Sequence, residues 1–272
     1  MISRRQFTTT ARYALAAILT ALVFGQAGAV AEESTWSSLK RDIFDNRQIV
    51  EDAAGIQLEA PYRAEDAAVV PISVRISPEL AANTKKLTLV VDENPAPVAA
   101  EFHYGPAAGI GERYLATRIR VNSYSNVRAV IETNDGKLFM AAKFVKAAGG
   151  CSAPALKDAD AAQALVGKMR IKHHQTPISA KQRQAQLMIR HPQYSGFQMN
   201  QLTHLYIPAE FITDLEVKRG SDVVFRMTGG ISISENPNIR FSYAGSGDDT
   251  LKVTAKDTES RVFTMTANSS GS

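Results

Sequence analysis

The chain has 272 residues, of which 44% are hydrophobic and 21% are charged, and its formal net charge is +4 at pH 7. Three of its 31 basic residues and none of its 27 acidic residues lie at positions 1–31, so the rest of the chain carries a net charge of about +1. This near-neutral balance, without a basic stripe that alternates with aromatic residues, argues against nucleic acid as a partner.

Positions 1–31 contain the parts of a secretory signal. Basic residues come first, an apolar run follows at 13–24, and a small-x-small cleavage signal lies at 29–31. The apolar run is shorter than the roughly 20 residues that a membrane-spanning helix needs. Ser3-Arg4-Arg5-Gln6-Phe7 matches the core of a twin-arginine signal, and an ordinary Sec signal is the alternative. We expect a cleaved signal peptide, a soluble periplasmic protein and no membrane association.

The segment 32–146 is predicted to be a β-sandwich domain that begins with a short helix. The sequence from Trp36 to Phe44 places four large apolar side chains on one helical face, with Thr35 as the candidate N-cap. Asn134-Asp135-Gly136 predicts a hairpin turn, because these residues tolerate the positive φ of primed turns. Alternating apolar and polar residues predict strands at Val69–Ser77, Lys86–Asp92, Tyr114–Tyr124 and Asn126–Val145.

The segment 168–272 has the same pattern, and its strands are spaced as in a β-sandwich. Each half also contains the tripeptide E-N-P, at 93–95 and at 235–237, which is a weak repeat signal that fits two domains of related topology. The expected strands are Lys168–His174, Arg183–His191, Phe211–Gly229, Ile239–Gly245, Thr250–Asp257 and Ser260–Ala267.

Residues 147–167 have no strand pattern and are predicted to be a flexible linker. The only cysteine of the chain, Cys151, lies at its start, directly after Gly149 and Gly150. In an oxidising compartment a lone thiol is either exposed and reactive or buried and inert. We predict that Cys151 is an exposed covalent attachment point and that the two glycines act as its hinge. The alternative is a small apolar loop residue without chemistry.

Longer motifs resemble a known family. The first half resembles SoxY, the sulfur-carrying subunit of bacterial thiosulfate oxidation, in VDENPAPVAAEF, TRIRVNSYSNVRAVIETNDGKLFM and KFVKAAGGC. The second half resembles its partner SoxZ in MRIKHH, HPQYSGF, YIPAEFITDLEVKRG and ISENPNIRFSYAG. The fused order and the G-G-C-S-A-P hinge resemble the SoxYZ-like carrier proteins associated with quinoprotein dehydrogenases.

The resemblance implies an all-β fold of two immunoglobulin-like β-sandwich domains that pair with each other. It implies a non-catalytic carrier that holds a sulfur-containing or other thiol-linked intermediate on Cys151. The partners would be periplasmic redox enzymes, either Sox-type cytochromes and hydrolase or a quinoprotein dehydrogenase. Ser152 stands where the terminal SoxY arm has glycine, and the chain continues, so this arm is tethered at both ends. The alternative function is a non-covalent docking module for a quinoprotein dehydrogenase, in which the thiol is incidental.

No other motif predicts chemistry. The five histidines (His103, His173, His174, His191 and His204) lack metal-ligand spacing, and His173 and His174 should point to opposite faces of one strand. Nucleotide-binding and nucleophile-elbow motifs are missing from the sequence. We therefore expect no cofactor, no metal site and no enzymatic activity of the chain alone.

Overall fold

The computed structural model describes residues 34–154, 163–179, 182–201, 203–246 and 249–268. From Thr35 onward the chain forms one compact unit. The signal peptide predicted at 1–31 lies outside the described residues. Among the helices that are described, none has the length and apolar character needed to cross a membrane.

The predicted N-terminal helix is confirmed as α2 (Thr35–Phe44), although it includes Thr35, which was expected to precede it as the cap. Its apolar face packs on the large sheet of the first half, where Phe44 is buried. The Arg128 guanidinium lies 4.0 Å from the centre of the Trp36 ring. The same guanidinium forms a buried ion pair with Asp92 at 2.7 Å. The sheet thus holds the helix by packing and by one cation–π contact.

The strands predicted for the first half are confirmed, except that the one expected at Tyr114–Tyr124 ends at Ile119, and several short elements join them. The strand at Val98–Tyr104 was not predicted, because the prolines before it conceal its alternation. The elements are β1 (Ile49–Val50), β2 (Ile56–Glu59), β3 (Val70–Ile76), α3 (Pro78–Ala81), β4 (Thr84–Val91), β5 (Val98–Tyr104), η1 (Pro106–Ala108), β6 (Arg113–Ile119), β7 (Ser125–Thr133) and β8 (Leu138–Val145).

The strands predicted for the second half are also confirmed. The long segment expected at 211–229 forms two strands joined by a tight turn at Gly220, whose φ is 58°. The elements are β9 (Met169–Ser179), β10 (Gln182–Ile189), β11 (Ile212–Arg219), β12 (Asp222–Gly229), β13 (Asn238–Ala244), β14 (Thr250–Asp257) and β15 (Val262–Asn268).

The two halves repeat one topology. In the first half the strand order is β8-β7-β4-β5 in one sheet and β2-β3-β6 in the other. In the second half the order β15-β14-β11-β12 and β9-β10-β13 matches it strand for strand. The E-N-P tripeptides do not mark this repeat, since 93–95 joins β4 to β5 whereas 235–237 joins β12 to β13. The expected relation between the halves is therefore present in topology, but not at those motifs.

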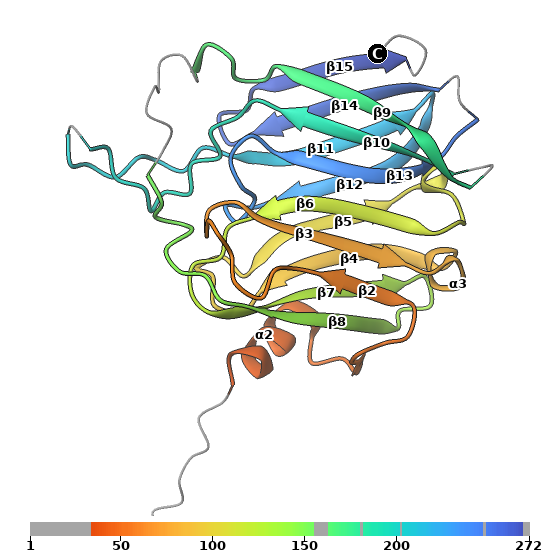
Figure 1. Ribbon diagram of the computed structural model, residues 1–272, viewed down its shortest axis with the longest axis horizontal. Helices are drawn as coiled ribbons and strands as arrows, with labels where there is room; N and C mark the ends of the chain where they lie inside the picture. Colours follow the sequence, from red (N-terminus) through yellow and green to blue (C-terminus); the bar gives the residue numbers. More distant parts are fainter. Residues whose placement is uncertain (1–33, 155–162, 180–181, 202, 247–248, 269–272) are drawn as a thin grey trace, which may run out of the picture. The chain divides into compact units, whose positions relative to one another are not determined.

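The halves join edge to edge. β5 pairs antiparallel with β12, and β6 pairs antiparallel with β13, so that sheets of nine and six strands run through both halves (Figure 1). Each pairing covers a strand edge that would otherwise expose unpaired backbone groups. The core is continuous across the junction, where the Phe225 ring lies 5.6 Å from that of Phe102 and 5.1 Å from that of Phe241. The expected pairing of the halves therefore takes the form of shared sheets.

We predict that the halves stay together when the chain is cut. A protein cleaved within residues 155–162 should elute as one complex in size-exclusion chromatography, because two strand pairings and a shared core hold the fragments. Phe225→Asp should separate them, whereas Phe144→Asp, at a side chain that is 42% exposed, should not. Two fragments that are folded by circular dichroism but elute separately would contradict the pairing.

Candidate functional site

Cys151 lies on the segment that leaves β8 and crosses one end of the first half toward the second half. We call residues 147–154 the arm. The Gly149 N–H donates to the backbone carbonyl of Asn122 at 2.8 Å. The Cys151 N–H faces the side-chain Oδ1 of the same asparagine at 3.4 Å. The arm is thus docked on the chain that follows β6.

In the structure, backbone conformation and close packing explain why the arm has glycine at these two positions. Gly149 has a φ of 78°, a value that favours glycine. A Cβ atom at Gly150 would lie 2.2 Å from the carbonyl oxygen of Ala67 and 2.7 Å from that of Val121. Gly150 also donates its N–H to Val121 at 3.1 Å. The glycines allow close docking of the arm, and their role as a hinge stays a prediction.

The predicted exposure of Cys151 is wrong for this conformation. Its side chain is only 1% exposed, and it counts among the buried apolar residues of the protein. The physical reason is that Gly149 and Gly150 let the arm approach the backbone of the first half so closely that the next residue is covered. The role of Cys151 as the attachment residue is a separate matter and stays a prediction.

One buried guanidinium connects the arm to both halves. Arg120, directly after β6, is 1% exposed. It donates through Nη1 to the carbonyl of Gly150 at 3.2 Å and through Nη2 to the carbonyl of Gln193 at 3.0 Å. A buried guanidinium must find acceptors, since leaving it unpaired costs several kcal/mol, on the order of 3–5. Arg120 therefore fixes the arm against the loop that follows β10.

Two side chains of the second half close over the arm. The hydroxyl of Ser195 donates to the carbonyl of Cys151, and Nε2 of Gln198 donates to the carbonyl of Ala153 at 3.0 Å. Ser195 and Gln198 also bind each other, because the Ser195 N–H donates to Oε1 of Gln198 at 3.1 Å. We call Ser195 and Gln198 the clasp. The clasp thus binds the backbone carbonyls of two arm residues, Cys151 itself and Ala153.

Asn94 of the first E-N-P motif stabilises the segment after β6 on which the arm docks. Oδ1 of Asn94 accepts the Asn122 N–H at 2.8 Å. Its Nδ2 donates to the carbonyl of Arg120 at 2.8 Å and to the hydroxyl of Ser232 in the second half at 2.9 Å. Asn94 thus fixes the chain on which the arm docks. Sequence reasoning noted the motif but missed this role, because its partners are 26 to 138 residues away.

Burial and the nearby positive charge have opposite effects on the pKa of the Cys151 thiol. Burial raises the pKa of Cys151 above its ordinary value, and the Arg120 charge works in the opposite direction. Burial lowers the pKa of Arg120, while Cys151, Glu235 and Asp66 favour its charged form. Burial also raises the pKa of Glu235. In the docked arm the thiol is therefore mainly protonated at neutral pH, and a protonated thiol is a poor nucleophile.

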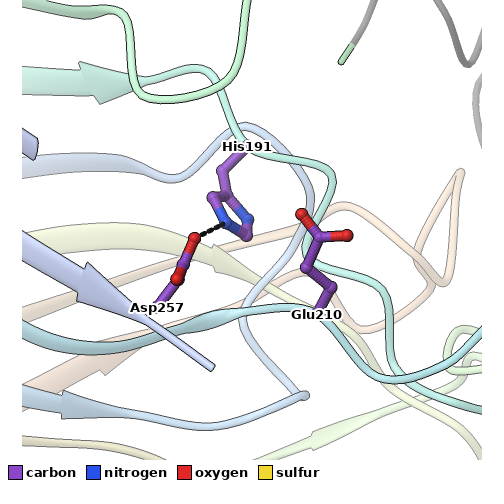
Figure 2. Close-up of side chains that lie close together, drawn as sticks. All are labelled: His191, Glu210 and Asp257. Carbon is purple, nitrogen blue, oxygen red and sulfur yellow. Dashed lines mark hydrogen bonds and ion pairs between the residues drawn. The ribbon is translucent and has the colours of Figure 1, made fainter. Parts of the chain in front are cut away.

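A second cluster lies at the base of the loop that carries the clasp (Figure 2). His191, Glu210 and Asp257 bring ligand atoms within 4.8 Å of one another, a grouping that sequence spacing did not reveal. Nε2 of His191 lies 3.4 Å from Oδ2 of Asp257, and its Nδ1 accepts the Gln193 N–H at 3.2 Å. The Arg261 guanidinium pairs with both carboxylates and so supplies the positive charge that a metal ion would bring. We interpret the cluster as an ion-pair network that fixes the loop.

The other histidines lie away from this loop or on its far part. His103 is on β5, His173 and His174 are on β9, and His204 follows the clasp. The hydrogen-bond partners of the arm are backbone, amide, hydroxyl and guanidinium groups, and none of the described histidines is among them.

Comparisons with known proteins match both halves. The family model of "Sulfur oxidation protein SoxY" matches residues 40–151, and that of "Sulphur oxidation protein SoxZ" matches residues 171–268. The predicted domain boundaries at 32–146 and 168–272 stay predictions. None of the curated proteins that were compared matches this chain. SoxY and SoxZ belong to carrier proteins rather than enzymes, so the expectation of a non-catalytic protein is confirmed.

Two solved structures are similar in part. The sulfur carrier protein SoxY from Chlorobium limicola f thiosulfatophilum is 25% identical, with 42% of this chain and 91% of that chain covered and a TM-score of 0.34. A family 2 glycosyl hydrolase from Bacteroides cellulosilyticus is 14% identical, with 74% of this chain and 24% of that chain covered and a TM-score of 0.20. Since neither TM-score reaches 0.5, the functional conclusion depends on the two family models.

Gly150→Ala should undock the arm. The added methyl group meets two carbonyl oxygens, and such overpacking lowers the free energy of unfolding by about 1–3 kcal/mol. We also expect faster maleimide labelling of Cys151 in the folded protein. Gly111→Ala is the control, since this glycine has no positive φ and its added Cβ meets only the Gln182 side chain at 3.4 Å or more, and it should leave labelling unchanged. Equal labelling rates in both variants would show that Gly150 does not hold the arm.

The docked thiol should also make stability depend on alkaline pH. Because the pKa of Cys151 is raised in the folded state, the thiol stabilises the fold below its unfolded pKa, and this contribution is lost as pH rises through the folded pKa. Between about pH 8 and pH 10 the free energy of unfolding should therefore fall more steeply in the wild type than in Cys151→Ala. Urea unfolding at several pH values measures this, and parallel profiles would refute it.

Proposed function

Because the chain is a SoxY domain fused to a SoxZ domain, we propose that it is a covalent sulfur carrier that holds its cargo on Cys151. The observation that carries the proposal is that the SoxY match extends to Cys151, the only cysteine in the chain. A carrier that binds sulfur covalently needs a nucleophilic atom that forms reversible bonds to sulfur, and the thiolate is the side chain that does so.

The chemistry of loading explains why such a carrier needs partners. When a thiol is joined to the outer sulfur of thiosulfate, an S–S bond forms, the thiol loses one proton, and two electrons leave the pair of sulfur atoms. The electrons must pass to an acceptor, so the loading partner is a redox enzyme. Unloading by hydrolysis or further oxidation is likewise the task of a partner. We assign these tasks to periplasmic enzymes, either Sox-type cytochromes and hydrolase or a quinoprotein dehydrogenase.

A carrier of this kind needs two arrangements of its arm. In the docked arrangement Cys151 is buried and its thiol pKa is raised, which protects it from stray oxidants. In the second arrangement the clasp opens and the thiol enters a partner's active site. The five residues from Lys146 to Cys151 span at most about 17 Å when extended. That reach suffices for the cleft of an enzyme bound beside the arm.

Location follows from the same proposal. We propose that residues 1–31 direct the chain to the periplasm by the twin-arginine route, which transports folded proteins. The support is the sequence pattern of a twin-arginine core, an apolar run and a small-x-small cleavage signal. A disulfide-permissive compartment suits a protein with one cysteine that is kept buried until it is used.

The burial of Cys151 favours one alternative function. A thiol that stays in the core would be incidental, and the chain would then be a docking module for a quinoprotein dehydrogenase. A Cys151→Ala strain separates the two functions: full dehydrogenase-dependent growth agrees only with the docking module. Loss of growth, with normal amounts of folded protein, agrees only with the carrier.

The direct test is the mass of the intact protein. Protein purified from its native host grown on a reduced sulfur compound should carry adducts on Cys151 that add one or more sulfur atoms or a thiosulfate group. Reduction with a thiol reagent should remove the adducts, and Cys151→Ser should carry none. A single unmodified mass under these conditions would rule out the carrier function.

A further inference from the structure

The loop that carries the clasp continues into an apolar hairpin. We call residues 197–207 the hairpin, of which position 202 is not described. The Ile207 N–H donates to the carbonyl of Gln198 at 2.8 Å, and Met199 pairs with Tyr206. In Figure 1 it is part of the teal segment between β10 and β11 that extends away from both sheets. The hairpin therefore projects from the end of the molecule where the arm is docked.

The surface of the hairpin is unusually apolar. Phe197 is 45% exposed, Met199 37%, Leu205 68% and Tyr206 67%. No Asp, Glu, Lys or Arg lies among residues 191–209, although at the chain average of 21% a stretch of 19 residues would hold about four. Aromatic residues and methionine without charges are typical of the buried centre of a protein interface. An exposed apolar patch of this kind marks a binding surface.

A basic pocket borders the same loop. The pocket has a volume of about 470 Å³, and the side chains of Met169 and Met188 contribute to its lining. Its cationic residues are Arg118, Lys168, Arg170 and Arg190. In the described part of the chain, none of these four forms an ion pair with an acidic residue within 4.0 Å. Arg118 donates to the Asn236 carbonyl and is favoured in its charged form by Glu235. The charges of Lys168, Arg170 and Arg190 are thus available to an acidic group from outside.

Hydrogen bonds connect the pocket and the hairpin to the arm. Asn236, which lines the pocket, accepts from Nη2 of Arg118 at 2.8 Å and donates its N–H to His191, the first residue of the loop, at 2.9 Å. Gln198 belongs both to the hairpin and to the clasp, since its side chain holds Ala153 at 3.0 Å. A partner that contacts the hairpin therefore contacts the element that covers Cys151.

We propose that the hairpin and the basic pocket are the docking face for the enzymes that load and unload Cys151, and that docking opens the clasp. The proposal rests on the proposed carrier function. The occupant is a partner enzyme whose docking face combines an apolar patch, for the hairpin, with acidic side chains, for the pocket. We place the partner on this face because the hairpin is continuous with the clasp, which already holds the arm. The thiol is then released only where an enzyme is present to receive it.

The test compares two ways of loading Cys151. In the native host, the fraction of protein with an adduct is measured by intact mass for the wild type and for the double variant Leu205→Asp, Tyr206→Asp. In the purified proteins, tetrathionate replaces the enzyme: the thiolate attacks an inner sulfur, forms the S-thiosulfonate adduct and releases thiosulfate. The controls are Val262→Asp, at a side chain that is 60% exposed on β15, and Lys252→Glu on β14.

We expect the fraction of protein with an adduct in the host to be at least tenfold lower for the hairpin variant than for the wild type. The purified hairpin variant should react with tetrathionate at the rate of the wild type. Arg170→Glu should lower loading in the host in the same direction, and the two controls should not. The clasp variant Ser195→Ala, Gln198→Ala should react faster with tetrathionate, because its arm is less tightly held.

Equal adduct fractions in the host for the wild type and the hairpin variant would overturn the docking face and leave the carrier function intact. A wild type without any adduct would instead remove the carrier function and the docking face with it. If the hairpin variant converts a dimer of the purified protein into a monomer, or abolishes binding to anionic lipid vesicles, the occupant is a second copy or a membrane, and the proposal is wrong.

Discussion

The rest of the candidate site depends on the burial of one guanidinium. Arg120 is buried between the two halves and the arm, and its two terminal nitrogens need acceptors there, while its Nε has no hydrogen-bond partner among the described residues. The terminal nitrogens find them in the carbonyls of Gly150 and Gln193, which belong to the arm and to the second half. Because both acceptors are backbone groups, their positions are determined by the folded chain. The arm, the end of β6 and the loop after β10 therefore take up their positions together.

The fusion of the halves explains where this meeting point lies. The halves share two sheets through β5·β12 and β6·β13, so the end of β6 is close to the second half. An arm that leaves the first half and continues into the second must pass this junction. It is tethered on both sides, which shortens its reach but keeps it near the clasp. A second attachment restricts the volume that the arm can explore, so its effective concentration near the clasp is higher than that of an arm attached at one end only.

The sequence predicts the strands better than it predicts the site. Alternation of apolar and polar residues identified both strands of the hairpin at Asn134-Asp135-Gly136 and most strands of the second half, because local periodicity reports local burial. Gly149 and Gly150 were predicted to form a hinge, but a glycine pair in a sequence fits close packing of the backbone as well as backbone flexibility. Only the carbonyls of Ala67 and Val121, more than twenty residues away in sequence, distinguish the two. Burial of Cys151 follows from these distant contacts and was not predictable.

Docking of the arm must be strong enough to protect the thiol and weak enough to be reversed. Six hydrogen bonds hold the arm directly, and their donors are on Gly149, Gly150, Cys151, Arg120, Ser195 and Gln198. At about 1 kcal/mol net each, they amount to about 6 kcal/mol, which leaves on the order of one molecule in tens of thousands undocked. A partner that binds only the open form must supply that difference, which an apolar contact surface of a few hundred Å² is able to provide at about 25 cal/mol per Å². A carrier with this balance exposes its thiol rarely in free solution and readily in a complex, so the protection of Cys151 and its presentation follow from the same few contacts.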